Sequence, residues 1–291
     1  GGTNFQQTNA IDALTPSGTL VAGISRTGPE VDAAGFTVTS VVGVDSIESG
    51  TAGSREAGEN LLLVGDELIA WENIVDNGDG TYTVEGVYRG VLDTVQLDHA
   101  GGARVFFMSE GAGTTNEDGY GGDLTLNTKL APKSIVDTVP LGDATAMSIT
   151  TAARALRPLP PGKFRIEGVR PGPAVTGAFS VTWAHRNRLH ETIVSQDANS
   201  VAPEPGTTYN LRVFDAFDSL IVQLEGISDA ATAATVNLVS SGTIRVELEA
   251  QRDGLTSWMK QIGTFAYTAD GATEDSIIAD EPEYVMDGGG A

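Results

Sequence analysis

The sequence predicts an all-β protein, with small β-barrel-like units in its first half and a β-sandwich in its second half. The 291 residues include 36 Gly and 12 Pro, together with many Thr and Val. This composition is typical of short strands that are joined by tight turns. Apolar and polar residues alternate along several segments, which is the period of a half-buried strand. Clusters of Gly, Asn and Asp separate these segments and favour hairpin turns.

The first half contains a series of expected strands. Residues 35–44 and 59–75 are rich in β-branched and aromatic residues and lack helix-capping signals. The sequence DNGDG, residues 76–80, has the chemistry of a hairpin turn, because Gly, Asn and Asp tolerate a positive φ. TYTVEGVYRG, residues 81–90, follows as the return strand, and ARVFFM, residues 103–108, is the next strand.

The middle of the chain is irregular before it becomes regular again. GAGTTNEDGYGGD, residues 111–123, has no apolar periodicity and is expected to be a loop. Further strands are expected at 124–130 and within 146–156. RPLPPG, residues 157–162, interrupts the chain, because each proline fixes φ and lacks an N–H donor.

This interruption places the domain boundary. Residues 1–156 are expected to form one or two β-rich units, and residues 157–271 a seven-stranded sandwich. In FSVTWAHRNRL, residues 179–189, Phe, Val and Trp183 alternate inward, so we expect Trp183 to be buried in the core. TIRVELEAQRDG, residues 243–254, alternates in the same way. Residues 272–291 are acidic and are expected to form a flexible tail.

Charge and cysteine content exclude several function classes. The chain has 17 basic and 39 acidic residues, a formal net charge of −22. Such a charge repels phosphate backbones and anionic membranes, so nucleic acid is not an expected partner. There is no cysteine, which excludes disulfides, thiol nucleophiles and thiolate metal sites. No apolar run approaches the ~20 residues of a membrane-spanning helix, so no direct membrane span is expected.

One stretch resembles an active-site loop. VYRGVLDTVQLDHAGGARVFF, residues 87–107, contains Arg89, Asp93, Asp98, His99 and Arg104. His99 could act as a general base oriented by a carboxylate, because the free pKa of histidine is near neutrality. However, neither Thr94 nor Ser109 lies in a nucleophile-elbow motif. We therefore interpret the stretch as scaffold, in which these side chains bond loop carbonyls between two strands.

Two histidines near Trp183 are weak metal candidates. His185 and His190 flank Arg186 and Arg188, but HETIV lacks the second histidine of the H-E-x-x-H motif. Two ligands are too few for a typical metal site. We expect these basic residues to form ion pairs with neighbouring carboxylates.

Other motifs are also incomplete. DNGDG resembles a calcium loop, but Gly78 replaces an oxygen ligand and Val87 stands where the closing Glu belongs. GAGTTN begins like a dinucleotide-binding fingerprint, but Asn116 replaces the last glycine. Carboxylate pairs for glycoside hydrolysis stay open, because sequence spacing does not test their separation. No catalytic, cofactor-binding or metal-binding residue is therefore predicted, and no cofactor.

The second half resembles a fibronectin type III domain. The segments that carry this resemblance are RIEGVRPGPAVTGAFSVTWAHRNRL, PGTTYNLRVF and TIRVELEAQRDGLTSW. Trp183 has the position of the family's early-strand tryptophan. The family usually has a tyrosine on the penultimate strand, where this chain has Ile244, so we expect the tyrosine-corner hydrogen bond to be absent.

A second resemblance covers roughly residues 60–260. Its segments, in order, are GDELIAWENIVDNGDGTYTVEGVYRG, DHAGGARV, ALRPLPPGKFRIEG, VTWAHRNRL and RDGLTSW. They resemble the C-terminal part of tailed-phage tail-tip or baseplate-hub proteins, including the hubs of phage-like gene transfer agents. The resemblance implies a structural, non-enzymatic protein of the virion tail tip, assembled in the host cytoplasm. It also implies that the chain forms a homotrimer. The implied partners are other tail-tip, baseplate and fibre proteins and a host cell-surface receptor.

A different function class is also open. Sandwiches of this type often accompany sugar-active enzymes, so the chain could be a secreted or cell-surface carbohydrate-binding module. Exposed aromatic side chains such as Trp71 or Trp258 would then stack on sugars. The motifs of the first half favour the tail-tip interpretation, in which residues 111–123 and 272–291 are the expected contacts with other subunits.

Overall fold

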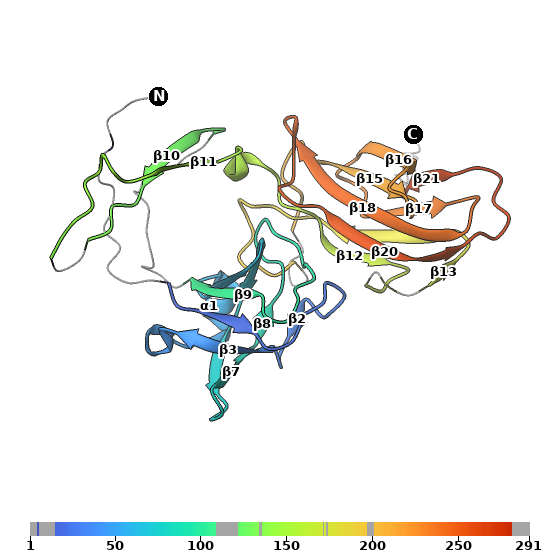
Figure 1. Ribbon diagram of the computed structural model, residues 1–291. Coiled ribbons are helices and arrows are strands. Elements are labelled where there is room, and N and C mark those ends of the chain that lie inside the picture. Colours follow the sequence, from blue (N-terminus) through green and yellow to red (C-terminus); the bar gives the residue numbers. More distant parts are fainter. Residues whose placement is uncertain are drawn as a thin grey trace, which may run out of the picture. The chain divides into compact units, whose positions relative to one another are not determined.

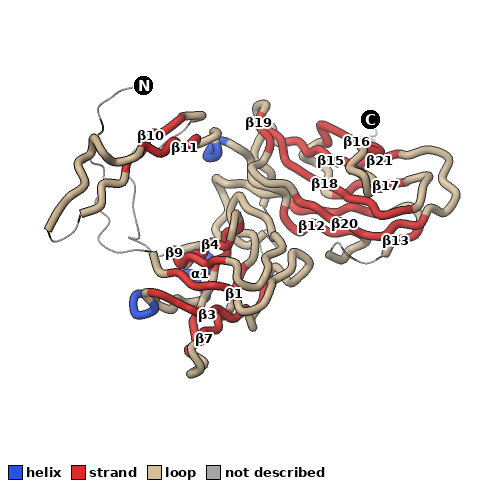
Figure 2. Tube along the Cα trace, in the orientation of Figure 1, coloured by secondary structure: helices blue, strands red, loops and turns tan. Residues whose placement is uncertain are grey.

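The computed structural model describes residues 5, 15–108, 122–133, 136–170, 172, 174–196 and 201–280. Strands dominate these residues, so the protein is all-β as the sequence predicts (Figure 1, Figure 2). The chain divides into two compact units. One unit combines residues 1–14 with 111–157, and the other combines residues 15–110 with 158–291. Within the described residues, no helix has the length and hydropathy needed to cross a membrane.

Residues 15–108 form a curved antiparallel sheet of nine strands, in the order β2-β8-β5-β4-β9-β1-β3-β7-β6. Buried side chains from strands along the whole sheet share one core, so the sheet curls around it like a barrel. Phe107 packs its ring at 86° to that of Trp71 in this core. The strands are β1 (Ser17–Leu20), β2 (Val31–Asp32), β3 (Phe36–Val42), β4 (Leu61–Val64), β5 (Glu67–Ala70), β6 (Asn73–Asp76), β7 (Thr81–Glu85), β8 (Val87–Tyr88) and β9 (Arg104–Met108).

The long apolar segment at 59–75 folds as three strands, β4, β5 and β6, which form successive parts of the sheet. Gly65 and Asp66 make the two-residue turn between β4 and β5, where Val64 pairs with Glu67. Gly65 has φ of 56°, a conformation that glycine adopts without a Cβ clash. This turn is difficult to predict from the sequence, because Gly65 is the only glycine in the largely apolar segment 59–75.

A short helix, α1 (Ala52–Ala57), was not expected from the sequence. The Thr51 side chain accepts a hydrogen bond from the Ser54 backbone N–H, and the Ser54 side chain accepts one from the Thr51 backbone N–H. This reciprocal cap begins the helix, and Gly58 with φ of 73° ends it. The described residues also contain two 3-10 turns, η1 (Val44–Ser46) and η2 (Arg154–Leu156).

Residues 162–279 form a β-sandwich around a second core. One sheet has the order β12-β14-β17-β21, and the other has the order β13-β20-β18-β15-β16, with β19 paired to β18. The strands are β12 (Gly162–Ile166), β13 (Val175–Thr176), β14 (Phe179–Ala184), β15 (Thr208–Phe214), β16 (Leu220–Ile227), β17 (Ala233–Asn237), β18 (Gly242–Arg252), β19 (Leu255–Thr256), β20 (Gln261–Thr268) and β21 (Ser276–Ala279).

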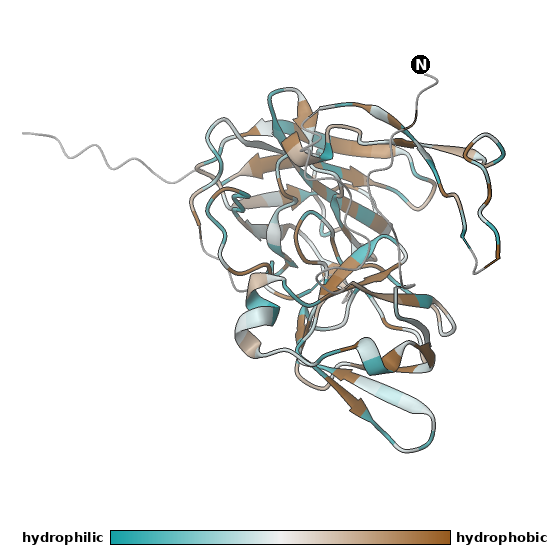
Figure 3. Cartoon of the chain, turned by 90° about the vertical axis from the view of Figure 1, so that its left-hand side faces the viewer, coloured by the Kyte–Doolittle hydropathy of each residue, from teal (hydrophilic) through white to brown (hydrophobic). Residues whose placement is uncertain are grey.

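The seven main strands, in chain order, are β12, β14, β15, β16, β17, β18 and β20. The first, second and fifth of them lie in one sheet, and the other sheet contains the seventh, sixth, third and fourth, in that order. This Greek-key arrangement is that of a fibronectin type III-like sandwich. The expected inward faces of β14 and β18 are buried, and apolar and polar residues alternate along the strands (Figure 3). Trp183 is 4% exposed and lies against Tyr209, with 5.5 Å between ring centroids. The prediction that Trp183 anchors this core is confirmed.

The corner hydrogen bond expected to be absent is present in another form. Ile244 is buried in the core, as its position in the sequence predicts. Tyr267 of the neighbouring strand β20 pairs with Gly242, the first residue of β18. Its hydroxyl donates to the backbone carbonyl of Leu238, at 3.1 Å, just before β18 begins. Tyr267 of β20 thus satisfies the corner carbonyl.

The segment expected as a flexible tail from residue 272 begins with sandwich structure. Ser276–Ala279 form β21, which pairs with β17 and adds Ile277 to the sandwich core. The reason is tertiary, because Ile277 gives this acidic segment an apolar residue for the core beside the available edge of β17. Residues 281–291 lie outside the described residues.

The other compact unit contains a two-stranded antiparallel sheet, β10 (Thr125–Lys129) and β11 (Ala146–Thr150), followed by η2. The sequence predicts one or two units within residues 1–156 and a separate sandwich, whereas the curved sheet and the sandwich belong to the same compact unit. The physical reason is a set of polar and apolar contacts that join residues 15–110 to residues 158–280, described below.

Candidate functional site

A buried carboxylate organises the loop that carries Arg89 and His99. Glu67, at the start of β5, has a fully buried side chain. Arg89 Nε donates to Oε1 at 2.6 Å, and Arg89 Nη2 donates to Oε2 at 2.7 Å. His99 Nε2 lies 2.8 Å from Oε2. The backbone N–H groups of Gly90 and Leu97 also donate to this carboxylate, at 3.0 and 2.9 Å.

These contacts keep Glu67 ionised. Burial raises the pKa of Glu67, but hydrogen bonds from His99 and Arg89 lower it, as do the charge of Arg89 and the Leu97 N–H. The net result is a pKa below the ordinary value of a glutamate. His99 therefore donates through Nε2 to a carboxylate that solvent does not reach. This arrangement orients a loop and offers no open oxygen to a substrate.

The other polar residues of this loop also have structural partners. The Asp98 carboxylate accepts from Arg26 Nε at 2.7 Å, from the Arg26 backbone N–H at 2.8 Å and from Ser25 Oγ at 3.1 Å. Partial burial raises the pKa of Asp98, but these hydrogen bonds and the Arg26 charge hold it below its ordinary value. Asp98 thus ties the loop to residues 25–26 instead of orienting His99.

Among the described residues, Thr94 is the hydroxyl that the sequence analysis considered as a nucleophile for His99. Thr94 Oγ donates to the carbonyl of Val91 at 2.8 Å, so it is part of a turn. Asp93 is half-buried and Arg104 is exposed. Ser109 lies outside the described residues. In the described part of residues 87–107, Arg89, Thr94 and Asp98 thus bond to backbone groups and neighbouring side chains that shape the loop.

The scaffold loop binds the sandwich. Arg186 Nη1 donates to the carbonyl of Leu92 at 2.7 Å, while its Nε and Nη2 pair with Glu191 at 3.0 and 2.7 Å. Gln196 donates to the carbonyls of Gly90 and Thr94. A small apolar cluster lies in the same region and is formed by Ala70, Tyr88, Val91, Leu61, Leu68, Leu92, Ile193 and Val194. The segment after β14 therefore packs directly on the loop of the curved sheet.

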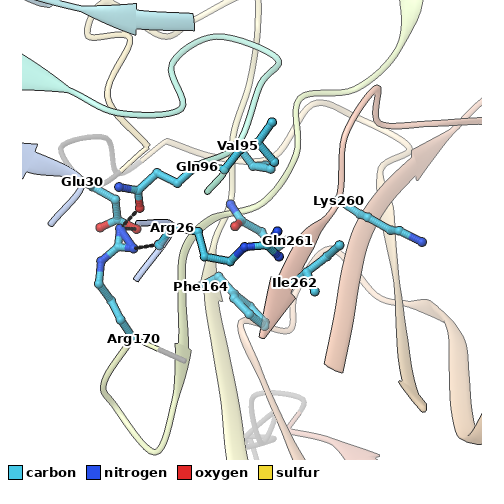
Figure 4. A pocket seen from close by; sticks show the side chains of 10 residues that line it. Arg26, Glu30, Val95, Gln96, Phe164, Arg170, Lys260, Gln261 and Ile262 are labelled. Carbon is cyan, nitrogen blue, oxygen red and sulfur yellow. Dashed lines mark hydrogen bonds and ion pairs between the residues drawn. The ribbon is translucent and has the colours of Figure 1, made fainter. Parts of the chain in front are cut away.

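A second ionic contact joins the same two domains. Glu30, 7% exposed, accepts from Arg165 at 3.1 and 2.9 Å and pairs with Arg170 at 2.9 Å. Figure 4 shows Glu30 and Arg170 beside a small pocket between the curved sheet and the sandwich. The other cations lining this pocket are also paired, Arg26 with Asp98 and Lys260 with Glu247. Its charged groups are therefore already neutralised by the protein.

The histidines near Trp183 do not converge. His185 Nδ1 lies 2.7 Å from the Tyr209 hydroxyl, and the two rings stack. Burial lowers the pKa of His185, although Asp229 opposes this effect. His190 is exposed. The part of the chain that the structure describes contains no group of three or more His, Cys, Asp or Glu placed to hold a metal ion.

The neighbouring arginines form the expected ion pairs. Arg186 pairs with Glu191 as described above, and Arg188 Nη2 lies 3.0 Å from Glu204. Arg252 of β18 also pairs with Glu204, whose side chain is 4% exposed. These pairs hold the loop after β14 against the sandwich.

The calcium-like sequence is a turn. The Asp76 carboxylate accepts from the Gly78 N–H at 2.8 Å, and Asp79 accepts from the Thr81 N–H and hydroxyl at 3.0 and 2.6 Å. Both carboxylates thus stabilise the β6–β7 hairpin. The dinucleotide-like GAGTTN, with Asn116, lies outside the described residues.

The proposed sugar-stacking aromatics differ from each other in exposure. Trp71 is 3% exposed and belongs to the core of the curved sheet, so the expectation that it is an exposed platform is wrong. The reason is that Trp71 continues the alternation of β5, in which Glu67 and Ile69 face inward. Trp258 is 40% exposed.

Sequence reasoning missed Glu67 and Glu30. Side chains alternate along a strand, so Glu67 lies on the same face as Ile69 and Trp71. The alternation therefore places a carboxylate on a buried face. A buried carboxylate requires a cation or hydrogen-bond donors, so this parity was a usable signal. Glu30 lies in a loop without apolar periodicity, and its partner Arg165 is 135 residues away along the chain. No local signal identifies such a pair.

Comparisons with known proteins found one family model, which matches the curved sheet, and solved structures with little sequence identity. A family model described as "Rcc01698-like, C-terminal" matches residues 16–106, which is less than half of the chain. No curated protein matches. The FN1-FN3 domains of chicken CNTN1 are 10% identical, with 89% of this chain and 68% of that chain covered and a TM-score of 0.25. The BSP domain of a biofilm associated protein is 12% identical, with 88% and 30% covered and a TM-score of 0.19.

Proposed function

We propose that the chain is a structural component of a phage tail tip or baseplate hub, in the central tail-fibre region, that supports tail assembly and host attachment. One observation carries the proposal. The segments with the tail-tip resemblance supply the residues that connect the curved sheet to the sandwich or that organise the connecting loop. These residues are Glu67, Arg89, His99, Arg165 and Arg186.

A structural role accounts for this pattern. Glu67 and Arg89 are buried and satisfied by each other and by backbone groups, so they fix the loop in one conformation. Arg186 and Gln196 then bind the carbonyls of that loop. Loss of one partner from a buried ion pair costs about 3–5 kcal/mol, so the pair holds the loop in the conformation that Arg186 and Gln196 bind. A part that transmits force along a tail needs this rigidity.

The proposal includes location and partners. The chain would be part of the virion tail tip, assembled in the host cytoplasm, as a homotrimer in contact with other tail-tip, baseplate and fibre proteins. The host surface receptor would be a further partner. It assigns no catalytic step or cofactor to the chain. Nor does it assign nucleic acid as a partner, because a net charge of −22 repels phosphate backbones.

Electron microscopy of particles tests this function. Particles from cells that carry the gene are incubated with gold-labelled antibodies against the purified chain, and particles from a deletion strain are the control. We expect gold at the tail tip only in the first preparation. Gold on the cell wall with unlabelled particles, together with binding of the chain to cell-surface glycans, would support the carbohydrate-binding module instead.

A further inference from the structure

The hairpin of β10 and β11 has one apolar and one polar face. Leu126 pairs with Ile149 and Thr128 pairs with Met147, so these four side chains share a face. We call this the apolar face of the hairpin, defined by Leu124, Leu126, Thr128, Leu130, Met147 and Ile149. Leu124, Leu130, Met147 and Ile149 are 46, 59, 46 and 53% exposed. The opposite face is polar apart from one alanine and consists of Thr125, Asn127, Lys129, Ala146, Ser148 and Thr150.

This hairpin has little core of its own. Among the described residues of its compact unit, the buried apolar side chains are Ala144 and Ala153. A two-stranded hairpin is only marginally stable in water unless its apolar side packs on something. Phe5 contacts the amino group of Lys129, which belongs to the opposite face, and Lys129 also donates to the Leu141 carbonyl. The apolar face therefore needs a cover that these contacts do not supply.

The charge distribution favours a second copy of the chain as the cover. Residues 1–14 and 111–157 hold four of the 17 basic and six of the 39 acidic residues, a formal charge of −2. The rest of the chain then carries −20 of the total of −22. Copies of such a chain repel each other least where the charge is lowest. The apolar face also contains no charged side chain.

We propose that the apolar face of the hairpin is the contact surface between copies of this chain. A patch that packs against its own equivalent is the isologous arrangement of a two-fold interface, whereas a three-fold ring brings equivalent patches together only around its axis. The proposal does not depend on the tail-tip function, because it follows from exposure and charge alone. The copy number of three comes only from the family resemblance, and the experiment below measures it.

The first experiment compares two charge variants of the full chain. Met147→Glu with Ile149→Glu places two carboxylates on the apolar face, and Ala146→Glu with Thr150→Glu places the same charge on the opposite face of the same strand. Mass is measured by sedimentation against protein and salt concentration. We expect wild type and the control to associate, more strongly in added salt because repulsion is screened. We expect the apolar-face variant to associate at least 10-fold more weakly.

Three results would overturn the proposal. They are a monomeric wild type at every concentration and salt level, equal association of the apolar-face variant, and equal weakening by the control variant. The fluorescence of the buried Trp71 and Trp183 reports whether each variant keeps the fold of the larger unit.

A second experiment avoids charge changes. The chain contains no cysteine, so a single introduced thiol reports on contact between copies. Met147→Cys should form a disulfide-linked dimer under mild oxidation, and Thr150→Cys should form much less. Equal cross-linking of the two variants, or none by either, would contradict the proposed surface. If cross-linking succeeds while antibodies fail to label tail tips, the contact stands and the tail-tip function fails.

Discussion

Glu67 shows how one residue can decide the role of a loop that resembles an active site. Its carboxylate takes hydrogen bonds from Arg89, His99 and two backbone N–H groups while it is fully buried. Charged groups remain in such a place only when every lone pair has a partner. The polar residues near His99 thus stabilise one loop conformation.

At the residue scale, Arg89→Met should destabilise the chain by about 3–5 kcal/mol, because the buried Glu67 loses its cation. Arg104→Met is the matched control, since Arg104 is exposed, and should change stability by less than about 0.5 kcal/mol. Urea unfolding of the full chain measures both. Equal effects of the two substitutions would mean that the Glu67 network does not stabilise the fold.

The lowered pKa of Glu67 predicts a dependence of stability on pH. A carboxyl whose folded pKa is depressed stabilises the protein above its unfolded pKa, and this contribution is lost as pH falls through the folded pKa. Wild type should therefore lose stability below about pH 4.5, the ordinary value for this residue. Glu67→Gln should lack this component, whereas the exposed Glu48→Gln should keep it. Parallel unfolding curves for wild type and Glu67→Gln across pH 3–6 would contradict the assignment.

At the scale of elements, alternation predicts the faces of β14 and β18 correctly, because each strand has one side on the core. Features that depend on distant or very local contacts were not predictable in this way. The cap of α1 needs only Thr51 and Ser54, which are common in loops. Strand β21 depends on the free edge of β17, a tertiary feature. Tyr267 replaces the corner tyrosine from another strand, so its role depends on register.

Trp183→Ala tests the sandwich core. The substitution removes a large buried side chain from the contact with Tyr209 and should cost about 3–5 kcal/mol. Trp258→Ala is the control, since Trp258 is 40% exposed, and should cost less. Denaturant unfolding followed by far-UV circular dichroism gives both values. A silent Trp183→Ala variant would show that the register of β14 is wrong.

At the scale of the whole molecule, ion pairs and apolar packing join the curved sheet to the sandwich within one compact unit. The sequence predicts a domain boundary in the proline-rich segment at 157–162, but it does not reveal that residues 15–110 associate with residues 158–291 in one compact unit. The partners are far apart along the chain, as Arg186 and Leu92 illustrate. Such contacts leave no local pattern.

Metal removal should leave the molecule unchanged. The acidic turn at 76–80 is satisfied by its own backbone and hydroxyl groups, and Glu30 and Glu67 are neutralised by arginines. We therefore expect the melting temperature of the full chain to be the same with EDTA, without EDTA and with added calcium. Calorimetry in the three buffers checks this expectation, and a fall of several degrees in EDTA would point to a bound ion.

We propose that this chain forms a rigid structural part of a phage tail tip. Cryo-electron microscopy of the intact particle tests it most directly, because the curved sheet and sandwich can be fitted together as one body. We predict density for that body at the tail tip, in several copies around one axis, three by the family resemblance, with hairpins in contact between copies. A particle without this density, or with a single copy that touches no other, would contradict the claim.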